Sequence, residues 1–241
     1  MTRFMPMPAS AHAGQLDLIM TLVHVVVGAL FVGWLAFLTW VLLRYRRSRQ
    51  PQADVEGLRS RTPGRLEIAV VLAEVVLLAG FALPAWVSLA GAPPEGSSPL
   101  VVRVVAEQFA WNAHYAGVDG VFGETRVHLV GPGNPLGLDR AGAGADDIVS
   151  TNRIPLIKDR PVMVQLSSKD VIHSFGLPNF RVKMDAIPGM LVPVWFTPTV
   201  AGAFDVVCSQ LCGLGHYRMR AVVEVVDEAA FNRFIAGEAD Q

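Results

Sequence analysis

The sequence is poor in cysteine, and this scarcity narrows what the chain can be. Cys208 and Cys212 are the only cysteines among 241 residues, which is enough for one thiolate metal site and not for several. The run Cys-x-x-Cys-His, which attaches a c-type haem covalently, is absent, and this excludes a fused c-type haem. The thiol chemistry of the chain is therefore confined to one short segment.

The sequence also has little net charge. It contains 20 Lys and Arg against 21 Asp and Glu, and residues 96–241 carry 12 basic and 15 acidic side chains. Because there is no basic excess, nucleic acid is excluded as a partner. The slightly acidic balance is compatible with a basic protein that docks by electrostatic steering.

Apolar residues make up 52 % of the chain and are concentrated near the N-terminus. The first apolar run, Leu18 to Leu43, has 26 residues and one ionisable side chain, His24; roughly 20 residues are enough to cross a bilayer. The second run, Ile68 to Leu89, contains Glu74. We predict a transmembrane hairpin over residues 1–92, with spans at about 18–43 and 68–89.

The segment between the two runs, residues 44–65, carries seven arginines against two acidic residues. By the positive-inside rule this loop is cytoplasmic, so both termini lie outside and everything after Ala90 faces the periplasm. We interpret the first run as an anchor and not a removed signal peptide, because no small-residue cleavage site follows it. A short leader ending within residues 9–13 is the alternative. The predicted location is a bacterial inner membrane that the chain crosses more than once.

Beyond a linker at residues 93–99, rich in Pro, Gly and Ser, the pattern changes to short runs rich in Val, Phe and Trp. Runs of this kind, bounded by Gly, Pro or Asn, predict strands, and six of them indicate a β-sandwich, here at residues 100–228. A Gly- and Ala-rich insertion at 131–150 is predicted to be a surface loop, and 229–241 a short terminal helix and tail. The predicted strands are 101–106, 125–130, 160–167, 192–197, 202–207 and 220–226.

The segment from Cys208 to Met219 combines two thiols, an imidazole and a thioether, which are soft or borderline ligands for copper. A blue-copper site with one ion needs only one thiolate, so one cysteine is in excess. Two thiolates can instead bridge two copper ions, each of which then needs one imidazole and one weak ligand. His216 and Met219 supply one of each. The candidate second imidazole is His173, at the end of a strand-like run, and a backbone carbonyl between the cysteines can be the remaining weak ligand.

Two simpler uses of this segment remain as alternatives. The two cysteines could form a disulfide, the usual state of paired cysteines outside the cytoplasm, but this leaves His216 and Met219 unexplained. A zinc site with two cysteines and two histidines would use the same side chains and ignore Met219.

The spacing Cys-x3-Cys-x3-His-x2-Met, together with Val-Ile-His-Ser-Phe at 171–175 and Lys-Met-Asp-Ala-Ile-Pro-Gly at 183–189, resembles subunit II of the haem-copper cytochrome c oxidases. The resemblance runs from the first apolar run to about Val226. It implies a cupredoxin-like Greek-key sandwich with a dinuclear copper centre, called CuA. The implied copper ligands are Cys208, Cys212, His173, His216, Met219 and the backbone carbonyl of Gln210.

The resemblance implies an electron-transfer role within a larger enzyme. Such a subunit accepts electrons from cytochrome c at CuA and passes them to a haem in subunit I, where oxygen is reduced to water. The implied partners are subunit I, subunit III, cytochrome c and membrane lipid. A quinol oxidase subunit of the same fold is an alternative that has no need of copper ligands. A second alternative is a membrane-tethered copper carrier, but a carrier needs exchangeable metal sites with few ligands.

In the same family, magnesium is bound by the side chain of a Glu that stands where this chain has Gln210. Because Gln is a poorer ligand for a hard cation than a carboxylate, magnesium is not among the predicted cofactors. Phe109 and Trp111 resemble the aromatic patch that receives the electron from cytochrome c, with Phe109 in place of a Trp. The alternative is that these two rings, two residues apart on a strand, only pack on one face.

Two acidic residues lie in the second apolar run or at its start. Glu67 matches the family position at the entrance of a proton path into subunit I; an anchor solvated by lipid headgroups is the alternative. Glu74 lies deeper, where an ionisable residue is a functional hypothesis by default. The simplest interpretation is a protonated Glu74 hydrogen-bonded to a neighbouring helix, with His24 as one candidate partner.

Overall fold

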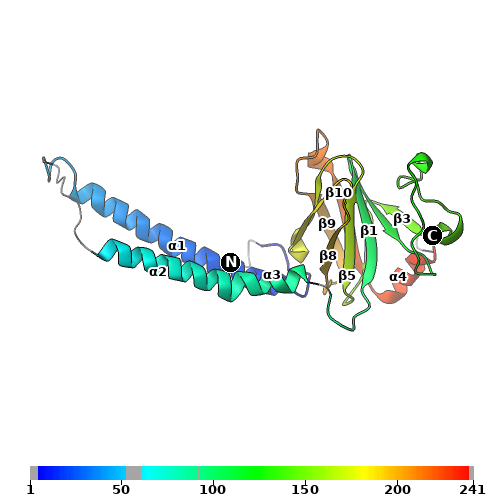
Figure 1. Ribbon diagram of the computed structural model, residues 1–241, viewed down its shortest axis with the longest axis horizontal. Helices are drawn as coiled ribbons and strands as arrows, with labels where there is room; N and C mark the ends of the chain where they lie inside the picture. Colours follow the sequence, from blue (N-terminus) through cyan, green and yellow to red (C-terminus); the bar gives the residue numbers. More distant parts are fainter. Residues whose placement is uncertain (1–4, 53–60, 92, 239–241) are drawn as a thin grey trace. The chain divides into compact units, whose positions relative to one another are not determined.

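A computed structural model of the chain describes residues 5–52, 61–91 and 93–238, in two compact units. The helical unit comprises residues 15–89, and the β unit joins the segment up to Gly14 to everything from Ala90 onward (Figure 1). Residues 53–60, which are part of the predicted cytoplasmic loop, lie outside the described residues, as do residues 1–4, 92 and 239–241.

The helical unit contains the two apolar helices that the sequence predicts. The first is α1 (Ala13–Arg44); the second is continuous from α2 (Thr62–Leu77) through a π-helical turn, η2 (Leu78–Ala82), into α3 (Leu83–Ala90). Both are long and apolar enough to cross a membrane, with 32 residues in the first and 27 in the second. Pro84 has no N–H to donate to the carbonyl four residues earlier, which accounts for the irregular turn just before it.

The β unit consists of two five-stranded sheets with one core between them. The first sheet has the order β3-β2-β1-β5-β8 and the second the order β4-β10-β9-β6-β7. The strands of the first sheet are β1 (Leu100–Glu107), β2 (Ala110–Tyr115), β3 (Ile148–Thr151), β5 (Val162–Ser168) and β8 (Val192–Phe196). Those of the second are β4 (Arg153–Ile157), β6 (His173–Leu177), β7 (Val182–Ala186), β9 (Gly202–Cys208) and β10 (Arg220–Val226), after which α4 (Glu228–Ile235) ends the described fold.

Alternating side chains explain the sandwich. In β1, Val102 and Val104 are buried in the core, whereas Val101 and Arg103 on the other face are only half-buried. This two-residue period is typical of a sheet with one face on a core. The predicted architecture of two N-terminal apolar helices followed by an all-β sandwich is confirmed.

Two details of the predicted strands are wrong. Residues 125–130 do not form a strand: Thr125 makes a single bridge to Leu138, and Val127–Leu129 is a 3-10 turn, η3, with Val127 91 % exposed. Strand preference reflects packing against neighbouring strands, and this segment has none. His173, in turn, does not follow a strand but begins one, β6.

The segment before α1 packs on the β unit, a contact that was not predicted. The Ala9 N–H donates to the carbonyl of Asn179 (2.8 Å), and the Ala9 carbonyl accepts from the Thr199 N–H (2.9 Å). The buried Ser10 hydroxyl donates to the carbonyl of Phe180 (2.7 Å). The described chain just before the first apolar helix is therefore part of the β unit.

Candidate metal centre

The candidate ligands come from two segments at one end of the second sheet. Strands β6 and β9 are antiparallel neighbours, with Phe175 opposite Cys208. The start of β6, at His173, therefore lies beside the end of β9, at Cys208. The loop from β9 to β10 carries the remaining ligand residues, and its two ends are joined where the Cys208 N–H donates to the carbonyl of Met219 (3.3 Å). This loop is drawn in orange at the top of the β unit in Figure 1.

Two free thiols form the middle of the cluster. The Sγ atoms of Cys208 and Cys212 are 3.8 Å apart, and no disulfide joins them. Both cysteines are buried, and one ligand atom from each, with one from His173, lie within 4.8 Å of one another. Burial, the hydrogen bond with Cys208 and the charge of Cys208 raise the pKa of the Cys212 thiol to about 11. Two thiolates in this place therefore need a cation to hold their charge.

His173 presents one ring nitrogen to this cluster and uses the other to fix its orientation. Its Nε2–H donates to Asp170 Oδ1 (2.8 Å). Burial opposes ionisation of Asp170, but hydrogen bonds from His173 and from the N–H groups of Gln108 and Val171 outweigh it and lower the pKa of this carboxyl. Because the carboxylate accepts from Nε2, the lone pair of Nδ1 faces Met219 Sδ at 3.1 Å. Two electron-pair donors facing each other this closely is the arrangement of ligands that share a metal ion.

A second imidazole and a backbone carbonyl complete the cluster around the two thiols. His216 Nδ1 lies 3.6 Å from Cys212 Sγ, and the Gln210 carbonyl oxygen lies 3.1 Å from Cys208 Sγ. His216 is half-buried and opens the short 3-10 turn η6 (His216–Arg218). The structure thus brings all six predicted ligand residues together, with one imidazole and one weak donor near each thiol. This donor set fits a pair of soft cations better than one zinc ion, because a zinc site of two thiolates and two imidazoles leaves Met219 unused.

The turn before β2 supports the loop, a contact that the sequence analysis missed. Gln108 Nε2 donates to the carbonyl of Cys212 (2.6 Å), and the Gln108 N–H donates to Asp170 Oδ2 (2.7 Å). The Phe109 ring lies so close to Gly215 that a Cβ there would be 2.4 Å from Phe109 Cδ2. The sequence contained one signal of this support: Asp170, an acidic residue three positions before the candidate ligand His173.

The predicted electron-entry rings lie at different depths. Trp111 is fully buried, with its ring centroid 6.1 Å from that of His173, whereas Phe109 is half-buried against the loop. The Trp111 Nε1 atom has no hydrogen-bond partner among the described residues. Three loop residues next to the ligands are strongly exposed: Leu211 (78 %), Leu214 (97 %) and Tyr217 (83 %).

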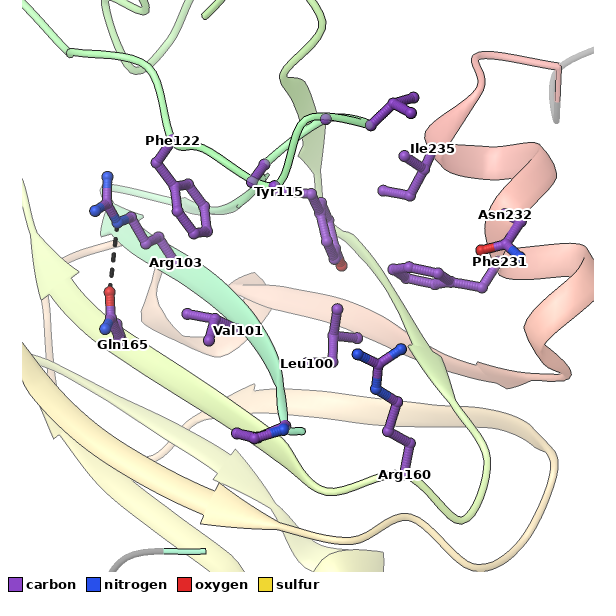
Figure 2. Close-up of a pocket in the computed structure, with 15 residues that line it drawn as sticks. Leu100, Val101, Arg103, Tyr115, Phe122, Arg160, Gln165, Phe231, Asn232 and Ile235 are labelled. Carbon is purple, nitrogen blue, oxygen red and sulfur yellow. Dashed lines mark hydrogen bonds between the residues drawn. The ribbon is translucent and has the colours of Figure 1, made fainter. Parts of the chain in front are cut away.

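Glu67, the predicted entrance of a proton path, is exposed on α2, five residues after the helix begins. A cavity of about 820 Å³ in the β unit is lined by none of the predicted ligand residues. Its lining comes mainly from β1, the end of β2 with the residues after it, and α4. Figure 2 shows the polar side chains of Arg103 and Arg160 among this lining, together with the apolar side chains of Val101 and Phe231.

The chain is similar to several known proteins. A sequence model of the periplasmic domain of cytochrome c oxidase subunit II matches residues 100–226. The alternative cytochrome c oxidase subunit 2 of Bradyrhizobium diazoefficiens is 31 % identical over 232 residues, covering 95 % of this chain and 82 % of that protein. The heme-copper oxidase subunit 2 of Aeropyrum pernix is 27 % identical, covering 87 % and 84 %. Among solved structures, the periplasmic domain of cytochrome oxidase subunit II of Bradyrhizobium japonicum has a TM-score of 0.44 and 26 % identity, covering 61 % and 96 %.

Proposed function

The chain belongs to the cytochrome c oxidase subunit II family, and on this premise we propose that it takes single electrons from cytochrome c at a dinuclear copper centre and passes them to a haem in subunit I, where oxygen is reduced to water. As a member of this family it is part of a haem-copper oxidase complex, an oxidoreductase. Its two apolar helices and the match to a periplasmic domain fit a membrane protein with a periplasmic β unit. We assign it to the inner membrane of a bacterium, with subunits I and III as partners.

One observation carries this proposal. Two buried thiols 3.8 Å apart have an imidazole nitrogen and a weak donor near each of them. Cys208 and Cys212, with the two imidazoles and the two weak donors, would hold two copper ions, and such a pair would supply one-electron chemistry. His173 Nδ1 lies next to the Met219 thioether, which leaves the Gln210 carbonyl as the weak donor to combine with His216. We assign each of these two pairs to one ion.

The protein contributes a nearly rigid ligand set. His173 belongs to a strand and its ring is held by Asp170, and Cys208 ends the neighbouring strand. Gln108 holds the carbonyl of Cys212 from the other sheet. Ligands that are fixed by strands and hydrogen bonds move little when the charge of the site changes. Electron transfer then needs little rearrangement of the protein.

Electron entry is assigned to the aromatic residues beside the loop. Trp111 is in edge-to-face contact with His173, and Phe109 packs under the ligand loop. Because Trp111 is buried, a donor protein cannot contact it directly and meets the loop surface at Leu214 and Tyr217 first. Glu67 remains our candidate for the entrance of a proton path.

The decisive experiment is copper analysis and electron paramagnetic resonance of the full chain, purified in detergent and reconstituted with copper. We expect two coppers per chain that share one unpaired electron, and a purple colour. A single copper, a bound zinc ion, or a colourless protein with its two thiols oxidised to a disulfide would contradict the proposal. Rapid transfer of the copper to a chelator would instead favour the copper-carrier alternative.

Met219→Leu tests the weak ligand. Removing the thioether while keeping the side-chain volume should shift the reduction potential and perturb the spectrum, with limited loss of copper. Met163→Leu in β5 is the matched control, because it makes the same change in the other sheet, and it should leave both properties unchanged. An unchanged spectrum in Met219→Leu would remove this residue from the ligand set.

A further inference from the structure

Glu74 is a carboxyl group near the middle of a membrane-spanning helix. The second apolar helix is apolar over Thr62–Ser88, and Glu74 is 12 residues after its start and 14 before its end. At 1.5 Å per residue this is about 18 Å from the start of the helix. At this depth hydrocarbon offers no hydrogen bonds, and each unsatisfied polar group is costly.

The helical unit offers Glu74 no partner. Among the described residues, nothing makes a hydrogen bond or an ion pair with its side chain. His24, the partner that the sequence allowed, uses its Nδ1–H to bond the carbonyl of Met20 in its own helix (2.7 Å). His24 also lies 20 residues from the Arg44 end of α1, at a different depth from Glu74. An internal pair with His24 is therefore not made.

Glu74 instead lines a hollow of about 180 Å³ between α1 and α2, whose other lining residues are all apolar. They are Val26, Leu30, Ala69, Val70, Ala73 and Leu77. Water is held in a buried site only where it finds two or more polar partners. Since the hollow offers only the carboxyl, bound water does not solve its hydrogen bonding. Lipid headgroups lie too far away, at the ends of the helix.

We infer that Glu74 marks a docking site for a transmembrane helix of subunit I, which presents a hydrogen-bonding side chain or carbonyl at mid-membrane depth. This inference rests on the proposed function, because it assumes that the chain assembles with subunit I. The carboxyl supplies the polar contact, and the apolar residues around it supply the surface on which the partner helix packs.

Two features beside Glu74 suit such a contact. Ala69 and Ala73 stand four residues apart on the wall of the same hollow, and small residues at this spacing allow close approach of a second helix. The π-helical turn begins four residues after Glu74, and the Leu78 N–H is shared between the carbonyls of Glu74 and Val75. Irregular backbone at membrane depth is tolerated where protein covers it, and π-helical turns are frequent at functional positions.

The test measures how much subunit I stays with the affinity-tagged full chain as detergent is increased. Glu74→Gln keeps the hydrogen bonding and removes the charge, so it should behave as the wild type. Glu74→Leu removes the hydrogen bond and should lower retention about three-fold to fifteen-fold, the range for one interhelical hydrogen bond. The matched control moves the carboxyl to another face at nearly the same depth, as Glu74→Leu combined with Val76→Glu. This control should not restore retention.

Three results would overturn the inference: equal retention in Glu74→Leu and wild type, loss in Glu74→Gln as large as in Glu74→Leu, or recovery in the double variant. The copper spectrum should be identical in all variants, which shows that the β unit is intact. Failure of the proposed function looks different, because the wild-type chain itself would then lack the copper signal or fail to retain subunit I.

Discussion

The β unit contains two buried imidazoles that are each hydrogen-bonded to an aspartate, and the two pairs have different structural roles. His173 Nε2 bonds Asp170 at 2.8 Å, and His114 Nε2 bonds Asp147 at 2.5 Å. Both rings are almost completely inaccessible to solvent. The difference lies in what surrounds each pair.

The second nitrogen of His173 faces Met219 and Cys208, so its lone pair points at a cluster of sulfur atoms. The His114 ring instead packs edge-on against Phe122, with centroids 5.0 Å apart. Its aspartate, Asp147, also accepts hydrogen bonds from the N–H groups of Gly117 and Gly123, in the segment between β2 and β3. The first pair thus orients a proposed metal ligand, and the second fastens the segment between β2 and β3 to the sheet. An aspartate–histidine pair alone therefore does not identify a metal site.

The largest effect is expected on copper binding, at the two thiols beside His173. Cys212→Ser removes a bridging thiolate and should abolish the two-copper signal, because a hydroxyl at this position does not replace a soft ligand. The spectrum and copper content of the full chain measure this. His114→Ala should leave both at wild-type values. A normal two-copper spectrum in Cys212→Ser would remove the basis for the thiolate bridge.

The second prediction concerns stability, for which His114 should matter more than His173. His114→Ala leaves the fully buried Asp147 carboxyl with only its backbone partners, and it opens a cavity beside Phe122. We expect the free energy of unfolding to fall by about 2–4 kcal/mol, measured by urea unfolding of the full chain in detergent. His173→Ala should lose copper without a comparable loss of stability in the copper-free form. Equal destabilisation by both variants in that form would contradict the division of roles.

The parts that could be predicted from the sequence are those with a local signal. The spans are continuous apolar runs, and β1 and β5 alternate with a period of two. Five of the six ligand residues lie within twelve positions, from Cys208 to Met219. A pattern of ligand types at fixed spacing therefore indicated the site without knowledge of the fold.

The parts that could not be predicted depend on contacts far apart in the chain. Strand β2 has no alternation, because residues of the segment between β2 and β3, among them Phe122 and Asp147, pack on its outer face at His114 and nearly every residue is buried. The bond from Gln108 to Cys212 joins residues 104 positions apart. Residues 125–130 have the composition of a strand but no strand to pair with. Such features follow from the folded arrangement and leave no periodic pattern in the sequence.

A smaller effect is expected at Asp170. Asp170→Asn keeps an oxygen that can accept from His173 Nε2 but removes the negative charge that orients the ring and makes it a better donor to a metal. We expect copper affinity to fall about 10-fold, the lower end for loss of such a partner, with both coppers still bound at saturation. Competition with a copper chelator measures this. Asp147→Asn is the matched control in the second pair and should leave copper affinity unchanged; a fall of similar size in both variants would contradict the assignment.

The smallest effect is a pH dependence that belongs to His114. Burial, helped by Arg103 and Arg140, outweighs the hydrogen bond with Asp147 and lowers the pKa of the imidazole below its ordinary value of 6.5. The unfolded chain therefore binds this proton more readily than the folded chain. The stabilisation by neutral His114 is complete above about pH 6.5 and is lost as pH falls through the folded pKa, with a slope of at most about 1.4 kcal/mol per pH unit.

Other groups titrate in the same range, so the measurement is a difference between two proteins. Urea unfolding at several values between pH 7.5 and about pH 5 should show a steeper loss of stability in the wild type than in His114→Gln, which keeps an N–H for Asp147 but does not ionise. Parallel curves would mean that His114 keeps its ordinary affinity for protons despite its burial. The pair of His114 and Asp147 would then resemble an exposed ion pair. The attachment of the segment between β2 and β3 to the sheet would need another source of stability.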